Sequence, residues 1–361
     1  MSSVRAIVRA AVYRPRAGVS DVGHRAPDED RFTLEATAIE RLLGDRAFPP
    51  APWTIRAAGD APTVAPWGFA AFLGAPVDIS WYPGGESGLR AAISAALSGS
   101  RPEIVVAADL PGAPGDVERR ANEAGGDGAV AFLVDNDPAP TERSTRPSPV
   151  ERADGEAVPA AAAWFRALPP GARGNWVGDW EVVGGGPNAP PSPPRLDAAD
   201  RPGGAVSEGA YLPRPRYLEG LPSRWRMVGE RCAGCGRTSF PLRGRCRNCG
   251  RSDGLVEVPL PRDGGTVTAL TWIGAGGQPT EFDDQVEATG GYGVAIVEIA
   301  PGTQGTFQLT DTARGELGLG SKVDTRLRRL YFQDGEWRYG RKAVPATVGA
   351  RRPAADSGEP R

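Results

Sequence analysis

Apolar residues in the first 135 positions follow two alternating patterns, one with helical spacing and one continuous as in a buried strand. The segment 28–30 is suited to cap a helix whose apolar face includes Phe32, Ile39 and Leu43. Helices are predicted at 32–43, 88–97 and 116–123, and strands at 77–80, 103–108 and 129–134. Because strands alternate with helices, we expect residues 1–135 to form a layered α/β domain.

Proline and glycine dominate residues 136–210. Prolines gather between positions 138 and 149 and again between 187 and 194, and three glycines at 184–186 precede the second group. Proline fixes the backbone angle φ and lacks an N–H donor, so a segment such as Pro190–Pro194 cannot hold a helix or a central strand. We therefore predict a semi-extended linker over 136–210.

Residues 211–346 contain five short β-like runs separated by glycine-rich turns. The runs lie at 266–272, 292–299, 306–309, 323–332 and 337–344. Five strands after a small metal-binding knuckle are typical of a compact barrel such as an OB-fold. We expect a lead-in helix and a zinc ribbon at 211–255, the barrel at 256–346, and a polar, disordered tail at 347–361.

The length, the net charge and the distribution of apolar residues exclude several classes of protein. A length of 361 residues suffices for two ordinary domains with connecting segments. The net charge of −2 gives no global basic field toward nucleic acid or anionic lipid. No apolar run reaches the roughly 18 residues of a membrane-spanning helix, and Arg5 and Arg9 interrupt the segment where a signal peptide would be apolar. A cytoplasmic protein with no membrane partner is predicted.

The four cysteines form two CxxC pairs. Cys232 and Cys235 make the first pair, and Cys246 and Cys249 make the second, each followed by glycine. A CxxC turn directs two thiolates to one point, so two such turns supply four sulfurs for a tetrahedral zinc ion. The alternatives are a redox CxxC motif and paired disulfides, but one redox motif needs no second copy and no feature marks secretion. We predict structural zinc without an open coordination position.

The motifs around these cysteines occur in a specific order. A short helix is followed by the ribbon, a Gly-Gly-Thr-Val opening of the barrel, a core strand and two late basic runs; they lie at 217–221, 232–249, 264–267, 293–298, 328–331 and 339–342. In this order, residues 217–345 resemble the acyl-CoA-associated zinc-ribbon/OB-fold family. Members of that family resemble accessory subunits that bind thiolase-superfamily enzymes. The resemblance therefore implies a scaffold role beside an acyl-CoA enzyme.

Several short motifs in the first half also occur in a recognisable order. They lie at 13–16, 27–30, 84–92, 105–109 and 126–129. With these motifs, residues 1–135 resemble the first half of a thiolase-superfamily enzyme, nearest to archaeal-type hydroxymethylglutaryl-CoA synthase. The second half of that fold is absent, because the predicted linker begins where it should start. The chain is thus expected to fuse a degenerate thiolase-like half to the zinc-ribbon module.

In the thiolase superfamily a cysteine is the nucleophile, and the resemblance aligns the position of that cysteine with Tyr82 of this chain. No cysteine occurs before Cys232, and the chain's single histidine, His24, lies in an early loop. A phenol with an ordinary pKa of about 10 is a poor replacement for an acyl-accepting thiol. Ser80 and Ser87 have no histidine base from which a catalytic triad could be assembled. We therefore expect no thiolase-type or synthase-type turnover from this chain.

The implied ligand is acyl-CoA, and the implied partner is a thiolase-superfamily enzyme. Thiolase-type enzymes dimerise through their N-terminal halves, so the degenerate half is expected to recruit an active relative. Arginine binds phosphate through two parallel, permanently charged contacts. Because alternate side chains of a strand point to opposite faces, Arg328 and Arg329 should not both face a ligand, and Arg329 with Arg341 is the predicted pair for CoA phosphates. Solvated surface arginines are the alternative.

Two other functions remain open. The first is residual acyl-CoA enzyme activity of the synthase type, through residues that no motif identifies. The second is single-stranded nucleic-acid binding by a zinc-ribbon/OB module, which needs a basic groove with stacking aromatics. Trp272, Tyr331 and Trp337 are candidates for stacking, although most aromatics of a small barrel belong to its core. Co-purification of a thiolase-type enzyme separates the scaffold role from both alternatives.

Overall fold

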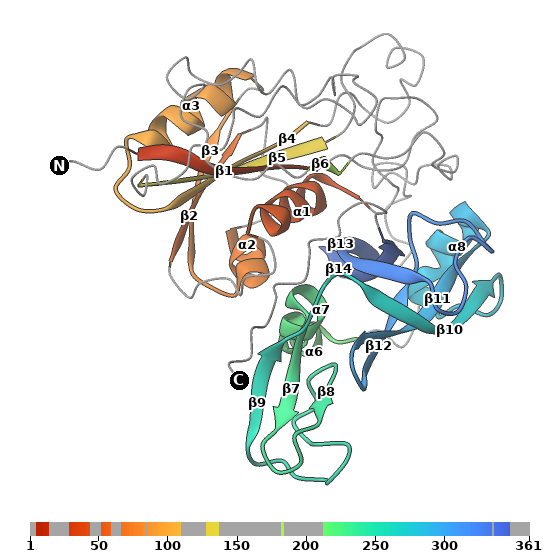
Figure 1. Ribbon diagram of the computed structural model, residues 1–361. Coiled ribbons are helices and arrows are strands. Elements are labelled where there is room, and N and C mark those ends of the chain that lie inside the picture. The colour runs from red at the N-terminus through yellow and green to blue at the C-terminus, as the bar shows by residue number, and fades with distance from the viewer. Residues whose placement is uncertain are drawn as a thin grey trace, which may run out of the picture.

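The computed structural model describes residues 5–13, 29–43, 52–58, 66–83, 86–109, 128–136, 182–183, 212–333 and 336–346. These residues form two units, which are shown in Figure 1. The N-terminal unit is the part up to residue 183 and is built on a six-stranded sheet. The C-terminal unit, from residue 212 onward, contains a three-stranded ribbon and a five-stranded sheet.

The six-stranded sheet has the strand order β3-β2-β4-β5-β1-β6. Its strands are β1 (Arg5–Tyr13), β2 (Trp53–Ala58), β3 (Val77–Tyr82), β4 (Glu103–Asp109), β5 (Gly128–Asn136) and β6 (Val182–Val183). Strands β3, β2 and β4 run parallel to one another, and β5 is antiparallel to both β4 and β1. Strand β3 is therefore an edge strand of the described sheet.

Helices cover both faces of this sheet, as Figure 1 shows. Helices α1 (Arg31–Leu43) and α2 (Pro66–Leu73) lie on one face, and α3 (Glu86–Leu97) lies on the other. Side chains alternate along β4 accordingly: Ile104 belongs to the core under α1, while Val105 belongs to the core under α3. The Asp30 carboxylate accepts the backbone N–H of Thr33 at 3.0 Å, which caps α1 as the sequence predicts.

The ribbon follows two short lead-in helices, α6 (Arg214–Glu219) and α7 (Leu221–Arg226). Its central strand β7 (Val228–Cys232) pairs antiparallel with β8 (Thr238–Ser239) and β9 (Leu255–Pro259). Cys232 is the last residue of β7, at the end of this strand that is distant from the lead-in helices, and the other three cysteines lie beside it. The metal ligands are thus held on the tip of the C-terminal unit.

The five-stranded sheet has the order β12-β11-β10-β13-β14. Its strands are β10 (Gly265–Gly274), β11 (Gly291–Ala300), β12 (Thr303–Gln308), β13 (Lys322–Gln333) and β14 (Glu336–Pro345). A parallel bridge between Leu309 and Ala343 joins the two ends of this order. The short helices η3 (Thr280–Phe282) and α8 (Asp283–Thr289) connect β10 to β11. All five predicted strands are confirmed, whereas the OB-fold itself stays a prediction.

Other sequence predictions have mixed outcomes. The predicted helices at 32–43 and 88–97 and the strands at 77–80, 103–108 and 129–134 are present. Strand β2 and helix α2 were not expected, because each is short and lacks a distinct periodicity. The predicted helix at 116–123, the tail and most of the predicted linker lie outside the described residues. Among the described helices, none is long and apolar enough to cross a membrane.

Candidate functional site

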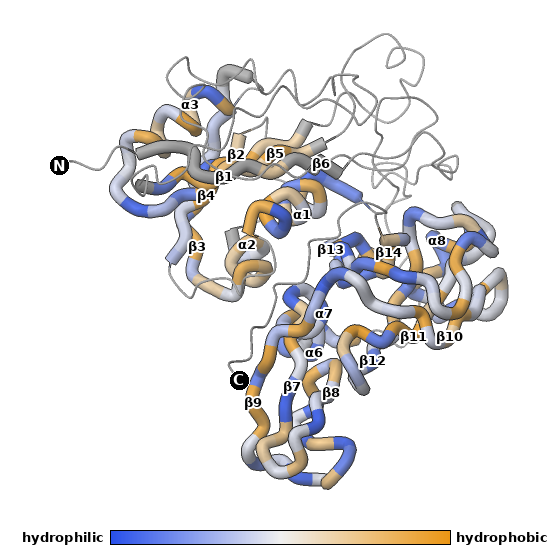
Figure 2. The backbone as a smooth tube through the Cα atoms, in the orientation of Figure 1, coloured by the Kyte–Doolittle hydropathy of each residue, from blue (hydrophilic) through white to orange (hydrophobic). Residues whose placement is uncertain are grey.

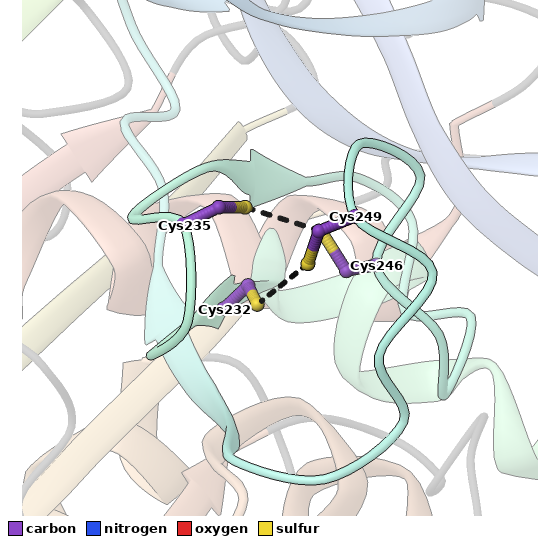
Figure 3. Close-up of side chains that lie close together, drawn as sticks. All are labelled: Cys232, Cys235, Cys246 and Cys249. Carbon is purple, nitrogen blue, oxygen red and sulfur yellow. Dashed lines mark hydrogen bonds between the residues drawn. The ribbon is translucent and has the colours of Figure 1, made fainter.

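The four cysteine sulfurs converge on one point at the tip of the ribbon. Figure 3 shows the four side chains directed toward one another from two loops. All four Sγ atoms lie within 4.8 Å of one another. The Sγ atoms of Cys232 and Cys249 are 3.6 Å apart, and those of Cys235 and Cys246 are 3.5 Å apart. The structure thus brings together every metal ligand that the sequence predicts.

The two loops are built by the same local rules. In the first, the Gly236 N–H donates to the Cys232 carbonyl at 2.8 Å, and in the second the Gly250 N–H donates to the Cys246 carbonyl at 3.0 Å. Gly236 and Gly250 have φ values of 71° and 77°, a left-handed conformation that favours glycine. The glycine after each CxxC pair therefore closes the turn that aims its two sulfurs.

This donor set fits zinc. A tetrahedral ion with Zn–S distances of 2.3 Å separates its sulfurs by about 3.8 Å, close to the shortest distances seen here. A disulfide would require a separation of about 2.05 Å. Cys232, Cys235, Cys246 and Cys249 would hold the ion, and four sulfurs leave no position for a reacting water. Zinc bound here would supply folding energy rather than catalysis.

The cluster also favours loss of thiol protons at one position. The backbone N–H of Arg237, together with the Asn248 side chain, lowers the pKa of the Cys235 thiol to about 6. The Arg251 N–H lowers the pKa of Cys249, but burial and the other three sulfurs outweigh it and raise that pKa to about 11. Thiol groups packed this closely repel one another when ionised, and a divalent cation relieves that repulsion.

Glu230 supports the second loop and was missed by the sequence analysis. It lies in β7 and is 5% exposed. Its two carboxylate oxygens accept the backbone N–H groups of Arg243 and Gly244, at 3.0 and 3.1 Å, just before Cys246. The sequence could have pointed to Glu230 only as an acidic residue two positions before the first CxxC pair. That its carboxylate accepts hydrogen bonds from the second loop follows only from the fold.

Tyr82 is the last residue of β3, and α3 begins at Glu86. Its hydroxyl accepts a hydrogen bond from Nη1 of Arg56 at 2.5 Å, and Nε of Arg56 donates to Glu103. The Arg56 guanidinium also lies over the Tyr82 ring, 5.9 Å from its centroid. The position at which the resemblance places a nucleophile therefore carries a phenol held by a neighbouring ion pair.

Arg329 and Arg341, the predicted phosphate ligands, both face the N-terminal unit. Arg341 is 6% exposed, and its Nη1 donates to the Glu40 carboxylate at 2.8 Å. The Arg329 guanidinium lies over Trp337 at 4.5 Å, with Nη2 3.4 Å from the Glu29 carbonyl. The N-terminal unit therefore covers Arg341. Phosphate binding by these residues stays a prediction.

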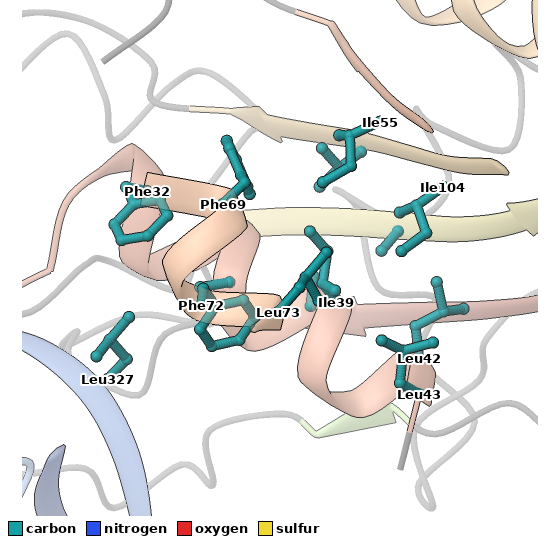
Figure 4. Close-up of a cluster of buried hydrophobic side chains, with 14 of the residues drawn as sticks. Phe32, Ile39, Leu42, Leu43, Ile55, Phe69, Phe72, Leu73, Ile104 and Leu327 are labelled. Atoms are coloured by element: carbon teal, nitrogen blue, oxygen red, sulfur yellow. The ribbon is translucent and has the colours of Figure 1, made fainter. Parts of the chain in front are cut away.

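Aromatic side chains join the two units around Trp225. The Trp225 ring contacts Phe32 of α1 at 5.6 Å and Trp67 of α2 at 5.9 Å between centroids. Its Nε1–H donates to the Tyr339 carbonyl at 3.0 Å. Figure 4 shows Leu327 of β13 beside the phenylalanines of α1 and α2. The two units therefore share one hydrophobic cluster.

Buried ion pairs surround this cluster. Figure 2 shows a strongly hydrophilic stretch along β13 near α1, and Arg326 and Arg328 of this strand are buried. Arg328 is fully buried and lies 2.9 Å from the Glu29 carboxylate, while the Tyr339 hydroxyl donates to Asp30 at 2.7 Å. The contact between the units thus combines aromatic packing with charges paired across it. No sequence pattern indicated this contact.

Comparisons with known proteins extend these observations. No family model matches the chain. A DUF35 domain-containing scaffold protein of Methanocaldococcus jannaschii is 30% identical over 127 residues, which cover 35% of this chain and 85% of that protein. This length agrees with the resemblance at residues 217–345.

Two solved structures are also similar. The Ltp2-ChsH2(DUF35) aldolase is 23% identical, covers 41% of this chain and 100% of that chain, and has a TM-score of 0.28. PksG, an HMG-CoA synthase from Bacillus subtilis, is 16% identical, covers 37% of this chain and 40% of that chain, and has a TM-score of 0.31. With scores this low, the thiolase-like origin of the N-terminal unit stays a prediction.

Proposed function

Because this chain belongs to the family of DUF35 domain-containing scaffold proteins, we propose that it is a non-catalytic scaffold for an acyl-CoA enzyme of the thiolase superfamily. The scaffold role in this proposal rests on membership of that family. The thiolase-type partner and the acyl-CoA are the finer part of the proposal, and they rest on the motifs of the two halves.

The observation that carries the proposal is the location of the cysteines in the chain. The chain has four cysteines, and all four sulfurs lie in one cluster suited to structural zinc. None remains to accept an acyl group, and the corresponding position at the end of β3 holds Tyr82. Arg56 donates to the Tyr82 hydroxyl but is itself permanently charged and cannot serve as a general base. The proposal therefore assigns covalent acyl transfer to the partner enzyme.

The edge strand β3 offers a surface for that partner. It pairs with β2 on one side only within the described sheet. Asp78 and Ser80 are exposed, and unpaired backbone groups along an edge strand can pair with another chain. Pairing here would join the N-terminal unit to an enzyme with a similar edge strand.

The test uses the full-length, tagged chain and a thiolase-superfamily enzyme from the same organism. We expect the two to co-purify, and labelled acetyl-CoA to add acetyl mass to the enzyme but none to this chain. The double variant Asp78→Arg/Ser80→Arg places charge on the edge strand and should release the enzyme. Glu219→Arg, at an exposed ion pair on α6, is the matched control and should retain it.

Two results contradict the proposal. Acetyl mass on the scaffold chain itself would show covalent catalysis. Absence of any thiolase-type enzyme from the complex, with the scaffold folded and loaded with zinc, would remove the proposed partner.

A further inference from the structure

The contact between the two units has the character of an interface between separately built domains. The N-terminal unit has a core of its own under α3, which includes Ile93 and Phe132. The C-terminal unit has another inside the five-stranded sheet, which includes Val297 and Phe307. Among the described residues, a third cluster around Trp225 contains side chains of both units. The contact between the units includes the aromatic rings of Trp225 and Tyr339 beside Arg328 and Arg341. Arginine and aromatic residues are enriched where proteins bind one another.

The charges on the two sides are complementary and closely matched. Glu40 of α1 accepts from Arg341 at 2.8 Å and from Arg262 at 2.6 Å, and Glu29 meets Arg328 at 2.9 Å. The acidic partners come from the N-terminal unit and the basic partners from the C-terminal unit. Buried charges of this kind discriminate strongly between a complementary and a non-complementary surface.

The C-terminal part of this fold also occurs without such an N-terminal unit. The archaeal relative is matched over 85% of its length by 127 residues of this chain, which leaves it no room for a second unit of this size. In this chain, by contrast, α1 and α2 cover the surface formed by Leu327, Arg328, Tyr339 and Arg341, here named the β13–β14 face.

We propose that the β13–β14 face is a docking surface for a domain that presents the α1–α2 surface, and that this chain closes it with its own N-terminal unit. When that intramolecular contact is disabled, the face binds the N-terminal unit of a second copy. The connection between the units, from Val183 to Arg214, is long enough for either arrangement, since an extended chain spans about 3.3 Å per residue. The closure is independent of which enzyme the scaffold serves.

Two full-length variants with different tags test the proposal. Glu40→Arg disables the N-terminal surface and leaves the β13–β14 face intact, while Arg341→Glu does the reverse. Mixed in equal amounts, they should form a heterodimer, because the intact N-terminal unit of one chain meets the intact face of the other. We expect this association to be at least tenfold tighter than that between two differently tagged wild-type chains, measured by pull-down and light scattering.

Controls separate this contact from other modes of association. A wild-type chain mixed with either variant should form no such heterodimer, because its own face is closed. Glu219→Arg, which changes an exposed ion pair outside the interface, should behave as wild type. Dimerisation through the β3 edge would occur equally in all of these mixtures and so is recognised as a background.

Two outcomes overturn the proposal: no heterodimer between folded, zinc-loaded variants, or association of wild-type chains as tight as that of the variants. Folding is checked by circular dichroism and metal content. If charge reversal unfolds either chain, the pair Glu40→Gln and Arg341→Met weakens the same contact without an added charge. For this second pair of variants, the same two outcomes would overturn the proposal.

Discussion

Glu35 and Glu40 lie on the same helix, α1, and their surroundings shift their pKa values in opposite directions. Burial raises the pKa of Glu35 to about 7, although the Arg31 guanidinium donates to it at 2.8 Å. Burial acts on Glu40 in the same sense, but Arg341 and Arg262 together outweigh it and lower the Glu40 pKa below its ordinary range. The number of cations that reach each carboxylate decides its ionisation.

This difference predicts a pH dependence for Glu35→Gln. Between the unfolded pKa of about 4.5 and the folded value of about 7, native Glu35 binds more protons than unfolded Glu35, so the wild type loses stability as pH rises. Glutamine removes that loss. Relative to pH 5, the variant should therefore gain up to about 3 kcal/mol over the wild type at pH 8, from about 1.4 kcal/mol per pKa unit.

Urea unfolding of both proteins at pH 5 and pH 8 measures this gain. Glu40→Gln is the control, because the contribution of Glu40 is fully present above about pH 4.5 and is lost only as pH falls further. Its destabilisation should be equal at the two pH values. Parallel pH profiles for the wild type and Glu35→Gln would contradict the assignment to Glu35.

At the scale of elements, the ribbon depends on contacts outside its four ligands. Glu230 in β7 holds the two N–H groups that precede Cys246, and so links the central strand to the second loop. Residues that support metal ligands typically contribute 10–100-fold to metal affinity. The ribbon is therefore expected to lose metal when this strand-to-loop connection is removed.

We predict one zinc per chain, with affinity lowered about 10–100-fold in Glu230→Ala. Alanine leaves two N–H groups without their acceptor, whereas Glu230→Gln keeps one oxygen and should show a smaller loss. Competition with a colorimetric chelator measures the affinity, and Cys249→Ser serves as the reference without a complete site. Equal zinc affinity in wild type and Glu230→Ala would show that the second loop is held by other contacts.

At the scale of the whole molecule, the shared cluster makes the two units depend on each other. Trp225 is fully buried and contacts side chains of α1, α2 and β14. Replacing it by alanine leaves a cavity between the units and typically costs about 3–5 kcal/mol. Trp225→Phe loses the two hydrogen bonds of Nε1 but keeps most of the ring contact, so it should cost less.

We accordingly expect the wild-type units to unfold in one cooperative transition, and Trp225→Ala to separate it into two. Hydrogen exchange reports on each unit separately and checks this directly. Protection should decrease together in α1 and β14 of the wild type. Independent loss of protection in these two elements of the wild-type chain would show that the shared cluster contributes little.

The sequence alone determined the features that depend on neighbouring residues. The CxxC spacing and the glycine after each pair specify the four-sulfur cluster, because each turn is closed by hydrogen bonds within five residues. Apolar runs likewise specify the five strands at 265–345, helices α1 and α3, and strands β3, β4 and β5. These features follow from local geometry and burial, which a sequence displays directly.

Only the tertiary structure decided what the late arginines do. In the sequence, Arg341 lies in a basic run that is typical of an exposed surface. In the structure, its guanidinium pairs with the carboxylate of Glu40, 301 positions earlier in the chain. The sequence around Glu40 is that of an ordinary charged helix residue, and its burial is evident only from the position of β14 in the structure. Charge complementarity between distant segments leaves no periodic signal in either segment, because it exists only when the fold brings the two surfaces together.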